Sequence, residues 1–554
     1  MVHLFKNNGY NIALDVCSSA VHVVDDVVYD VLEVLNDLPG LCSAAAGTAG
    51  ADHPASAEAS CTSGCAENAG KCSAAEAPDC AESTGKCSAA EAPDCAESTG
   101  KCSAVEAPDC AENAGDCGTL ADSCGSGSIV QGVQTRLDSE AVVSQVQAVL
   151  NGKYAGEEIR TACEECEELR AAGMLYTEDA YRPAIEEFAQ RQTVVKALCI
   201  HIAHDCNLAC RYCFAEEGEY HGRRAMMSAE VGKQALDFLV ANSGNRRNLE
   251  VDFFGGEPTL NWPVVKELVE YGRSIEEAHN KNFRFTLTTN GVLLNDEIME
   301  FCNREMGNVV LSIDGRPETN NRMRPFRGGQ SSYGLIVPKF QKFAELRHQN
   351  NYYVRGTFTH YNLDFAADVL HLADLGFKQI SVEPVVAPPE MDYAIREEDL
   401  PVIMEQYDIL AQEIIRREKE GRGFNFFHFM IDLEGGPCVY KRLSGCGSGT
   451  EYLAVTPWGD LYPCHQFVGI DEFCMGNVTE GVKREDLVLK FKHCNVYAKP
   501  ECASCFSRFF CSGGCAANAH HFTGDINGNY EIGCAMQKKR VECALMIKAA
   551  LADG

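Results

Sequence analysis

The sequence predicts an α/β fold built around a parallel sheet, and two patterns support this. From about residue 193 onward, apolar strand-like runs alternate with amphipathic helices in six consecutive units. Glycine-containing or polar motifs directly follow several of these runs. Consecutive parallel strands need crossover helices and bring their carboxyl ends to one edge of the sheet. We therefore expect an incomplete barrel or a doubly wound sheet, with its ligand site at that edge.

This alternation extends over residues 193–425. Ser228 is a natural N-cap for a helix that ends near Val240, and a second helix is expected over Val264–His279. The strand-like runs are Lys196–Ala203, Leu249–Phe254, Phe283–Thr288, Asn308–Ile313, Tyr352–Thr359 and Gln379–Val385.

A smaller module is predicted from two separated stretches, residues 1–38 and 138–185. The first has strand-like runs at Tyr10–Asp15 and Ala20–Val24 and a helix over Val27–Leu38. The second has two helical stretches joined by a Gly-Lys turn. Two strands and three helices outline a winged-helix-like module. In peptide-modifying enzymes such a module often binds the substrate's leader by adding a strand to its sheet edge. A purely structural cap fits the pattern equally.

Residues 41–136 separate the two halves of this module and have an unusual composition. A fifteen-residue unit with two cysteines occurs at 71–85, at 86–100 and, slightly altered, at 101–115. Its small and acidic residues include no aromatic side chain, so the repeats cannot bury a core and are predicted to be disordered. Metal binding is one alternative. Imitation of a cysteine-rich substrate is another, and it would lead the enzyme to modify its own repeats.

Charge and cysteine content narrow the functional classes. The 554-residue chain has a formal net charge of −32, which disfavours nucleic acid and anionic membranes as partners. It offers no run of about 18 apolar residues and no signal-peptide pattern at its start, so we expect a cytoplasmic protein. In a reducing cytosol, its 30 cysteines are expected to bind metal or perform chemistry.

Three cysteines with C-x3-C-x2-C spacing follow the first strand of the sheet. They are Cys206, Cys210 and Cys213. Three thiolates on one short loop can hold three irons of a [4Fe–4S] cluster and leave the fourth iron open for a ligand that is not protein. A structural zinc site differs because it closes with four ligands. A zinc loop or buried free thiols are the alternatives.

Later strands end in motifs that suit a small-molecule pocket. Gly255-Gly256-Glu257 ends the second strand, Thr289-Asn290-Gly291 the third and Ser312-Ile-Asp314 the fourth, with Arg324 downstream. The glycines allow a ligand to approach the backbone, and Glu257 can accept a hydrogen bond from an ammonium group. Each motif alone is compatible with an ordinary turn. Together they predict one pocket beside the cysteine loop.

The alternation stops near residue 430, and residues 430–554 have a second ordered cysteine pattern. A zinc ribbon is the alternative to an iron–sulfur assignment for four of these residues. The seven cysteines are Cys446, Cys464, Cys502, Cys505, Cys511, Cys515 and Cys534.

The three-cysteine loop, with Tyr212 directly before its last cysteine, resembles the signature of the radical S-adenosylmethionine (SAM) superfamily. The resemblance implies a partial (β/α)6 TIM-like barrel with SAM bound at the open iron, and an anaerobic host because such clusters are sensitive to oxygen. Gly256 and Glu257 would contact the amino group of SAM. Ser312 and Arg324 would contact its carboxylate, and Asn290 and Asp314 would lie nearby.

The C-terminal cysteine pattern resembles the SPASM domain, which carries two further [4Fe–4S] clusters and brings the expected total to three. By resemblance, Cys446, Cys464 and Cys515 would hold the inner auxiliary cluster. The fourth ligand of that cluster could be Cys438 or a thiolate of the substrate. The outer auxiliary cluster would be held by Cys502, Cys505, Cys511 and Cys534.

The segments HIAHDCNLACRYCFA and EYLAVTPWGDLYPCHQFVG are similar to those of maturases of six-cysteines-in-forty-five-residues (SCIFF) peptides. The similarity implies an oxidoreductase that forms thioether cross-links in a cysteine-rich precursor peptide through a 5′-deoxyadenosyl radical. An electron donor such as ferredoxin or flavodoxin would serve it. No catalytic protein residue is identified.

Three rival functions remain. Anaerobic sulfatase maturases have an aspartate after the inner-cluster cysteine, where this chain has His465, which counts against that activity. A peptide epimerase is a second radical SAM alternative. A non-enzymatic store of iron–sulfur clusters or zinc is the third.

Overall fold

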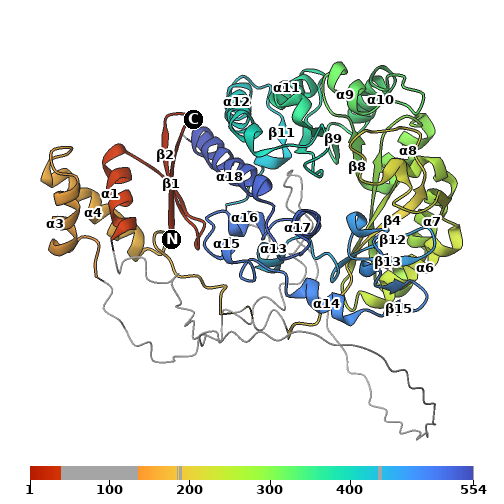
Figure 1. Ribbon diagram of the computed structural model, residues 1–554, viewed down its shortest axis with the longest axis horizontal. Helices are drawn as coiled ribbons and strands as arrows, with labels where there is room; N and C mark the ends of the chain where they lie inside the picture. The colour runs from red at the N-terminus through yellow and green to blue at the C-terminus, as the bar shows by residue number, and fades with distance from the viewer. Residues whose placement is uncertain (39–134, 184, 186–189, 434–438, 553–554) are drawn as a thin grey trace, which may run out of the picture. The chain divides into compact units, whose positions relative to one another are not determined.

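The computed structural model describes residues 1–38, 135–183, 185, 190–433 and 439–552 (Figure 1). Strands alternate with helices through the middle of the chain and pair in parallel, as predicted. The sheet order is β11-β10-β9-β8-β7-β6-β4-β12-β13-β14-β15, in which the parallel strands from β4 to β11 (Asn425–Phe426) lie in chain order and β12 joins the other side of β4. The short strand β5 (Ala225–Met226) pairs with β4 in antiparallel orientation. The predicted α/β class is confirmed.

Each of the six predicted parallel strands begins and ends within two residues of its expected position. Each strand contributes apolar residues to the buried core. Phe253 and Phe285, for example, are fully buried and stack with their ring centroids 5.6 Å apart. The strands are β4 (Ala197–His204), β6 (Asn248–Gly255), β7 (Asn282–Thr289), β8 (Met306–Ser312), β9 (Tyr352–Phe358) and β10 (Gln379–Pro384).

Crossover helices connect these strands. Ser228 caps the first of them by accepting a hydrogen bond from the Val231 amide, as its sequence position predicts. Gly232 allows this helix to pack closely on the next, because a Cβ there would lie 2.4 Å from Leu268. The helices are α6 (Ala229–Asn242), α7 (Trp262–His279), α8 (Asp296–Glu305), α9 (Pro317–Met323), α10 (Tyr333–Leu346), α11 (Phe365–Asp374) and α12 (Leu400–Lys419).

The C-terminal part of the chain continues the same sheet. Its first strand, β12 (Tyr452–Val455), pairs in parallel with β4, and β13 (Asp460–Tyr462) follows it in antiparallel orientation. Two short strands, β14 (Gly476–Asn477) and β15 (Gly481–Val482), then end the sheet. The remaining elements are the helices α13 (Val439–Ser444), α14 (Glu485–Lys492), α15 (Pro500–Ala503), α16 (Arg508–Cys511), α17 (Ala516–Thr523) and α18 (Glu531–Ala552).

The N-terminal module has three strands where the sequence predicted two. The additional strand is β1 (Val2–Asn7), which forms a hairpin with β2 (Tyr10–Asp15) across Asn8-Gly9. Both turn residues have positive φ, as a tight hairpin requires. That Asn-Gly turn already implied a strand on its N-terminal side. The third strand, β3 (Val21–Val24), is the other edge of this sheet.

Three helices complete the module and enclose a core of its own. They are α1 (Asp26–Asp37), α3 (Glu140–Val149) and α4 (Gly156–Ala171), close to the predicted positions. Val31 and Leu35 of α1 pack with Val143 of α3 and Cys166 of α4, all of them fully buried. The two stretches therefore form one packed unit although the intervening segment separates them in the chain.

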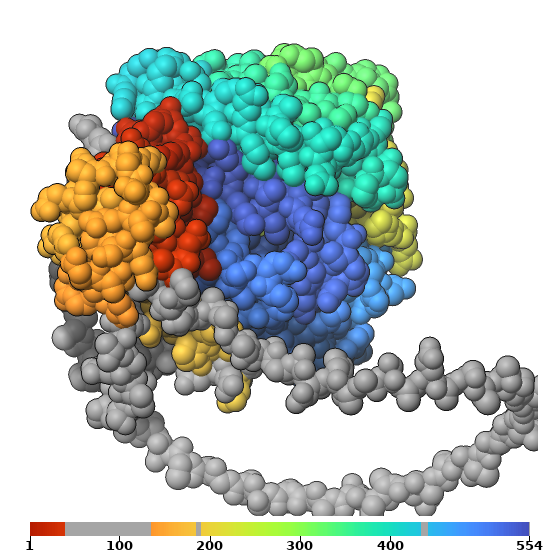
Figure 2. All heavy atoms as spheres, turned by 60° about the vertical axis from the view of Figure 1, so that its left-hand side comes forward, coloured from red at the N-terminus to blue at the C-terminus, as the bar shows by residue number. Residues whose placement is uncertain are grey.

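The C-terminal helix α18 joins this module to the rest of the protein. It packs against β1, β2 and α12 (Figures 1 and 2). The His3 ring stacks on Phe506 at 3.5 Å, and its Nε2 lies 2.9 Å from a carboxylate oxygen of Glu542. Asn7 donates to the Asp408 carboxylate on α12 at 2.8 Å.

Two predictions fall outside the described residues. The repeat insert over 41–136 lies there except for its last two residues, and Cys438 lies there as well. Among the helices that are described, none has the length and apolar character needed to cross a membrane.

Candidate functional site

The loop with Cys206, Cys210 and Cys213 begins directly after β4, at the carboxyl edge of the sheet. Its backbone is fixed by the segment that follows α9. The amide of Ala209 donates to the Pro325 carbonyl and that of Arg211 to the Met323 carbonyl, both at 2.9 Å. This pairing places Arg324 beside the cysteine loop.

The sulfur atoms of this loop lie in a buried environment that contains hydrogen-bond donors. The Cys206 sulfur accepts from the Leu208 amide at 3.5 Å and from the Asn290 side chain at 3.6 Å. Burial raises the pKa of the Cys206 and Cys210 thiols to about 12. Thiolates at these positions therefore need a bound cationic group, which iron would supply.

Tyr212, Asp314 and Arg324 form a hydrogen-bonded chain next to the loop. The Tyr212 hydroxyl donates to both oxygens of Asp314, at 2.7 and 2.9 Å, and accepts from Arg324 at 2.9 Å. The Thr357 amide also donates to Asp314. Burial raises the pKa of Asp314 to about 6, against the opposing charge of Arg324. The structure thus brings together three of the residues predicted for the pocket.

Glu257 has more protein partners than its predicted role suggested. One of its oxygens accepts from the Thr259 amide and hydroxyl and from the Thr289 hydroxyl, and the other accepts from the Asn290 amide at 2.8 Å. Burial raises the pKa of this carboxyl. The second oxygen has room for one further donor, so an ammonium ligand would complete a set that is largely satisfied already.

The glycines beside Glu257 are needed by the backbone itself. A Cβ on Gly256 would lie 2.2 Å from the Asp205 carbonyl oxygen, and one on Gly255 would lie 2.3 Å from that of Ala203. The Gly256 amide donates to the Ala203 carbonyl at 2.8 Å. Close packing of strand ends therefore accounts for these glycines. Ser312 is the last residue of β8 and lies outside the hydrogen-bonded chain formed by Tyr212.

Two buried donors near the loop have no acceptor among the described residues. They are Nε of Arg324 and Nδ2 of Asn207. The Asn207 carbonyl oxygen accepts from Asn290 at 2.7 Å, which fixes the amide so that its unused N–H group remains available. Buried donors of this kind usually have partners, so their presence suits an anionic ligand such as a carboxylate.

Aromatic side chains connect the cysteine loop with the C-terminal part of the chain. The ring of His465, directly after Cys464, lies 5.5 Å from that of Phe214 and 5.1 Å from that of Phe254. Phe214 directly follows Cys213 and remains 46% exposed. Burial lowers the pKa of His465 to about 4, so its imidazole is neutral at pH 7. Sequence reasoning did not single out the two phenylalanines, although each borders a predicted motif.

The C-terminal cysteines fall into two groups. We call Cys446, Cys464 and Cys515 the inner group. Burial raises the pKa of the Cys464 thiol, and the nearby Cys515 and Cys446 raise it further. Cys446 follows α13, Cys464 follows β13 and Cys515 precedes α17, so this group is drawn from three separate elements.

We call the other four cysteines the outer group. Burial raises the pKa of Cys511 to about 12, and each of the other three raises it further. They come from α15, from α16, from the turn between these helices and from α18. The members of the outer group are Cys502, Cys505, Cys511 and Cys534.

The cysteines of the inner and outer groups are too far apart to bind one metal ion together. Within the described part of the chain, no three His, Cys, Asp or Glu side chains are close enough to hold a single metal ion. A [4Fe–4S] cluster binds each thiolate through a different iron, so its ligands stand farther apart than those of one ion. Ligation by these cysteines remains a prediction.

Residues 200–364 match the Radical SAM superfamily. These residues form a radical SAM domain. The match begins within β4 and covers the cysteine loop, Glu257, the Tyr212 chain and β9, so the protein is an enzyme of the radical SAM type.

Relatives with this domain include enzymes of different activity. The radical SAM cyclopropyl synthase TigE of Paramaledivibacter caminithermalis is 22% identical over 361 residues, which are 60% of this chain and 70% of TigE. A cysteine-type anaerobic sulfatase-maturating enzyme of Clostridium perfringens is 23% identical over 335 residues, which are 56% of this chain and 85% of that enzyme.

A solved structure shares the fold. It is described as native anSMEcpe with bound AdoMet and Cp18Cys peptide, and it covers 65% of this chain and 99% of its own. The TM-score is 0.53 at 20% identity, a likeness that shows the fold alone.

A buried lysine lies between the radical SAM enzyme's two C-terminal cysteine groups. Lys499 is 2% exposed, and its ammonium donates to the carbonyls of Gly513 and Gly528 at 2.9 and 3.2 Å. Its charge lowers the pKa of Cys515 in the inner group and of Cys502 in the outer group. No carboxylate among the described residues pairs with it. Buried cations are usually paired, so this lysine suits anionic groups such as iron–sulfur clusters.

Proposed function

We propose that this radical SAM enzyme modifies a cysteine-rich, ribosomally synthesised peptide and forms thioether cross-links in it. One contact carries the proposal. His465 follows Cys464 of the inner group, Phe214 follows Cys213 of the barrel loop, and their rings are 5.5 Å apart. The segments that carry the two candidate cluster sites are therefore neighbours, as the joining of a peptide thiol to a reactive carbon between them would require.

The residues present fit the cofactors that this chemistry needs. When bound at the Cys206 loop, a [4Fe–4S] cluster and SAM together supply a 5′-deoxyadenosyl radical that can remove a hydrogen atom from carbon. Arg324 and Asn207 would direct their unused N–H groups at the SAM carboxylate, and Glu257 would accept from its ammonium. Phe214 and Phe254 would exclude water from the reacting groups.

The proposed reaction is an oxidation of the peptide. One hydrogen leaves a carbon, one proton leaves a cysteine thiol, and a carbon–sulfur bond forms between them. The peptide thus loses two hydrogens in each cross-link, and one electron must leave the product radical. The inner group (Cys446, Cys464 and Cys515) and the outer group (Cys502, Cys505, Cys511 and Cys534) would hold auxiliary clusters, which would supply an acceptor for that electron.

The N-terminal module is proposed to bind the leader of the peptide. Its sheet ends in β3, where Val23 is 49% exposed, while α18 packs on β1 and β2. An extended peptide could therefore add a strand beside β3 without displacing α18. The packing of α18 on β1 and β2 is equally compatible with a structural cap that binds no peptide.

The function is tested with anaerobically reconstituted enzyme, SAM, reductant and the cysteine-rich peptide encoded nearest to its gene. We expect a loss of two hydrogens per cross-link by mass spectrometry. The bridged cysteines should resist both thiol reduction and alkylation. A peptide that stays unchanged while SAM is cleaved would contradict the proposed substrate.

Anaerobic sulfatase maturation is the second candidate, because relatives of that type match as well as TigE does. A sulfatase-derived cysteine peptide, assayed in parallel, separates the two. Turnover of that peptide alone would replace the thioether proposal. A protein that holds iron but never yields 5′-deoxyadenosine would instead indicate a non-enzymatic store of iron–sulfur clusters.

A further inference from the structure

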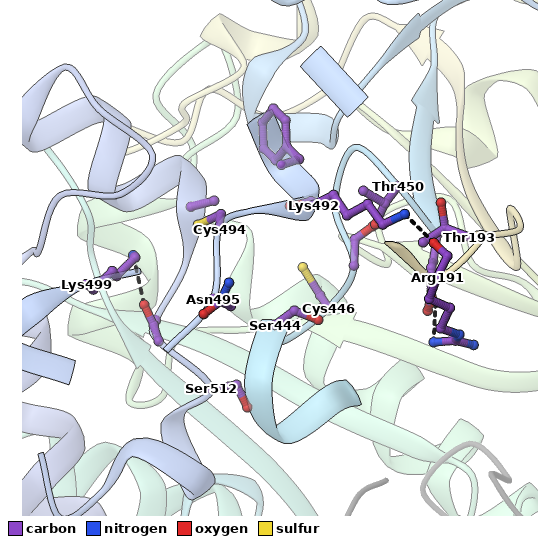
Figure 3. A pocket seen from close by; sticks show the side chains of 17 residues that line it. Arg191, Thr193, Ser444, Cys446, Thr450, Lys492, Cys494, Asn495, Lys499 and Ser512 are labelled. Atoms are coloured by element: carbon purple, nitrogen blue, oxygen red, sulfur yellow. Dashed lines mark hydrogen bonds and ion pairs between the residues drawn. The ribbon is translucent and has the colours of Figure 1, made fainter. Parts of the chain in front are cut away.

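A small cavity of about 40 Å³ opens beside the inner group, between α13, α14 and α17 (Figure 3). Cys446 lines it, and so does a cysteine outside every motif found in the sequence, Cys494. Gly514 and Ala516, the two neighbours of Cys515, also line the cavity. Figure 3 shows the Cys446 sulfur pointing away from α13 into the space that Cys494 also borders.

Backbone contacts hold these segments together. The Val496 amide, two residues after Cys494, donates at 2.9 Å to the Leu443 carbonyl, three residues before Cys446. A Cβ on Gly513 would lie 3.6 Å from the Val496 side chain, so the segment before Cys515 packs against the segment that contains Val496. Cys494 is therefore positioned by the elements that position two members of the inner group.

We propose that Cys494 is the fourth protein ligand of an iron–sulfur cluster held by Cys446, Cys464 and Cys515. This inference rests on the proposed function, which places a cluster at the inner group. With four thiolates, all four irons of the cluster would have protein ligands, and none would be open to a thiolate of the substrate.

The surroundings of Cys494 suit a ligand. Its thiol donates to the Ile526 carbonyl at 3.4 Å. On binding iron the thiol would release this proton to solvent. Cys494, Cys446 and Lys499 line the same cavity, next to the two residues that flank Cys515. Lys499 and Lys492 at the cavity would offset the negative charge of a four-thiolate cluster.

The experiment uses the full chain with Cys206, Cys210 and Cys213 replaced by Ala, so that only auxiliary clusters remain. This parent chain is compared with versions that also carry Cys494→Ala, Cys494→Ser, Cys438→Ala or Cys474→Ala. Cys474 is the matched control, because it is partly buried in the same part of the chain and its thiol also donates to a carbonyl, that of Gly476. Iron and sulfide per chain are measured, and electron paramagnetic resonance (EPR) spectra are recorded after mild oxidation and after addition of cyanide.

We expect the parent and the Cys474→Ala chain to resist oxidation and cyanide. Both Cys494 variants should form a [3Fe–4S] signal on oxidation, and cyanide should shift the spectrum of their reduced cluster. The same changes in Cys438→Ala, with Cys494→Ala behaving as the parent, would overturn the proposal. So would a parent that already binds cyanide, because its inner cluster would then have an open iron.

The parent spectra test the proposal even if the Cys494 variants fail to fold. A parent that holds iron for one cluster, or for none, would overturn the inference together with the inner cluster of the proposed function. If the parent holds both clusters and Cys494→Ala leaves them intact, only the inference fails. Because SAM cleavage is absent from this background, none of these outcomes depends on substrate turnover.

Discussion

The loop with Cys206, Cys210 and Cys213 follows a strand whose residues are all buried, whereas the two C-terminal cysteine groups are assembled from several helices, the turns between them and the end of a strand. The loop has its three cysteines within eight consecutive residues, and backbone pairing with the segment around Arg324 fixes it. The C-terminal groups draw members from elements far apart in the chain. Local order therefore creates the first site, and tertiary packing creates the other two.

The largest effect is expected from removing the locally built site. Replacing Cys206, Cys210 and Cys213 together by Ala should abolish SAM cleavage and remove the iron of one cluster, while the auxiliary clusters remain. Chromatography of 5′-deoxyadenosine and iron analysis per chain measure both quantities. Residual 5′-deoxyadenosine from this variant would move the radical chemistry away from the loop.

A smaller loss is expected from Arg324→Met, which removes a buried cation from the same site. Loss of a charge-assisted hydrogen bond costs about 1.5–3 kcal/mol, so the KM for SAM should rise roughly 10- to 100-fold. Arg322→Met is the control, because Arg322 lies two residues before Arg324, is exposed on α9 and lies over the Tyr361 ring. Equal KM values for the two variants would show that Arg324 only supports the fold.

Leader binding tests the N-terminal module, which carries none of the candidate cluster cysteines. Val23→Asp places a charge on the exposed edge strand and should weaken binding of the leader peptide on the order of tenfold, which corresponds to about 1.4 kcal/mol. Val149→Asp, at a 65% exposed position of α3 in the same module, should leave it unchanged. Fluorescence anisotropy with a labelled leader measures both. Unchanged affinity in Val23→Asp would favour the cap.

Lys499→Met is expected to affect the C-terminal groups and spare the loop. A nearby cation favours the reduced, more negative form of a cluster, so its removal should lower both auxiliary reduction potentials by on the order of tens of mV. A redox titration followed by EPR measures this change. An equal change in the SAM-binding cluster would show that the lysine acts through the fold as a whole.

The smallest effect concerns a buried histidine at the end of the sheet. Burial first, and then the charge of Arg540, lower the pKa of His428 to about 3. In the unfolded chain this histidine binds a proton near pH 6.5, whereas in the folded chain it stays neutral down to about pH 3. The free energy of unfolding therefore falls as the pH drops below 6.5, by up to about 1.4 kcal/mol per pH unit. His428→Gln should reduce this dependence in urea unfolding between pH 7 and pH 5. His348→Gln, at an exposed position, should leave it unchanged.

Sequence reasoning located the locally built parts of the protein well. The six parallel strands and the Ser228 cap follow from periodicity and capping chemistry, which act over a few residues. The strand β1 was missed, although the Asn8-Gly9 turn required a partner for β2. Glu257 was expected to serve a ligand, and its several protein donors became visible only when β6 and β7 were placed side by side.

Cys494 shows why the rest could not be predicted. It fits no spacing motif, and its relation to Cys446 depends on how the segment after α14 packs on the end of α13. No periodicity in the sequence encodes that contact. Phe214 and Phe254 are similar, since their importance depends on where His465 lies after β12 joins the sheet.

The pairing of β12 with β4 has a consequence for how this chain can be divided. β4 lies between β6 and β12, and all of its residues are buried. A protein that ended near residue 430 would expose one side of β4 as a row of unpaired amides and carbonyls, flanked by apolar side chains. Such an edge promotes association with other chains. The radical SAM domain is therefore expected to aggregate when it is expressed alone. Recombination that exchanges C-terminal parts between such enzymes must preserve β12, which covers this edge of β4.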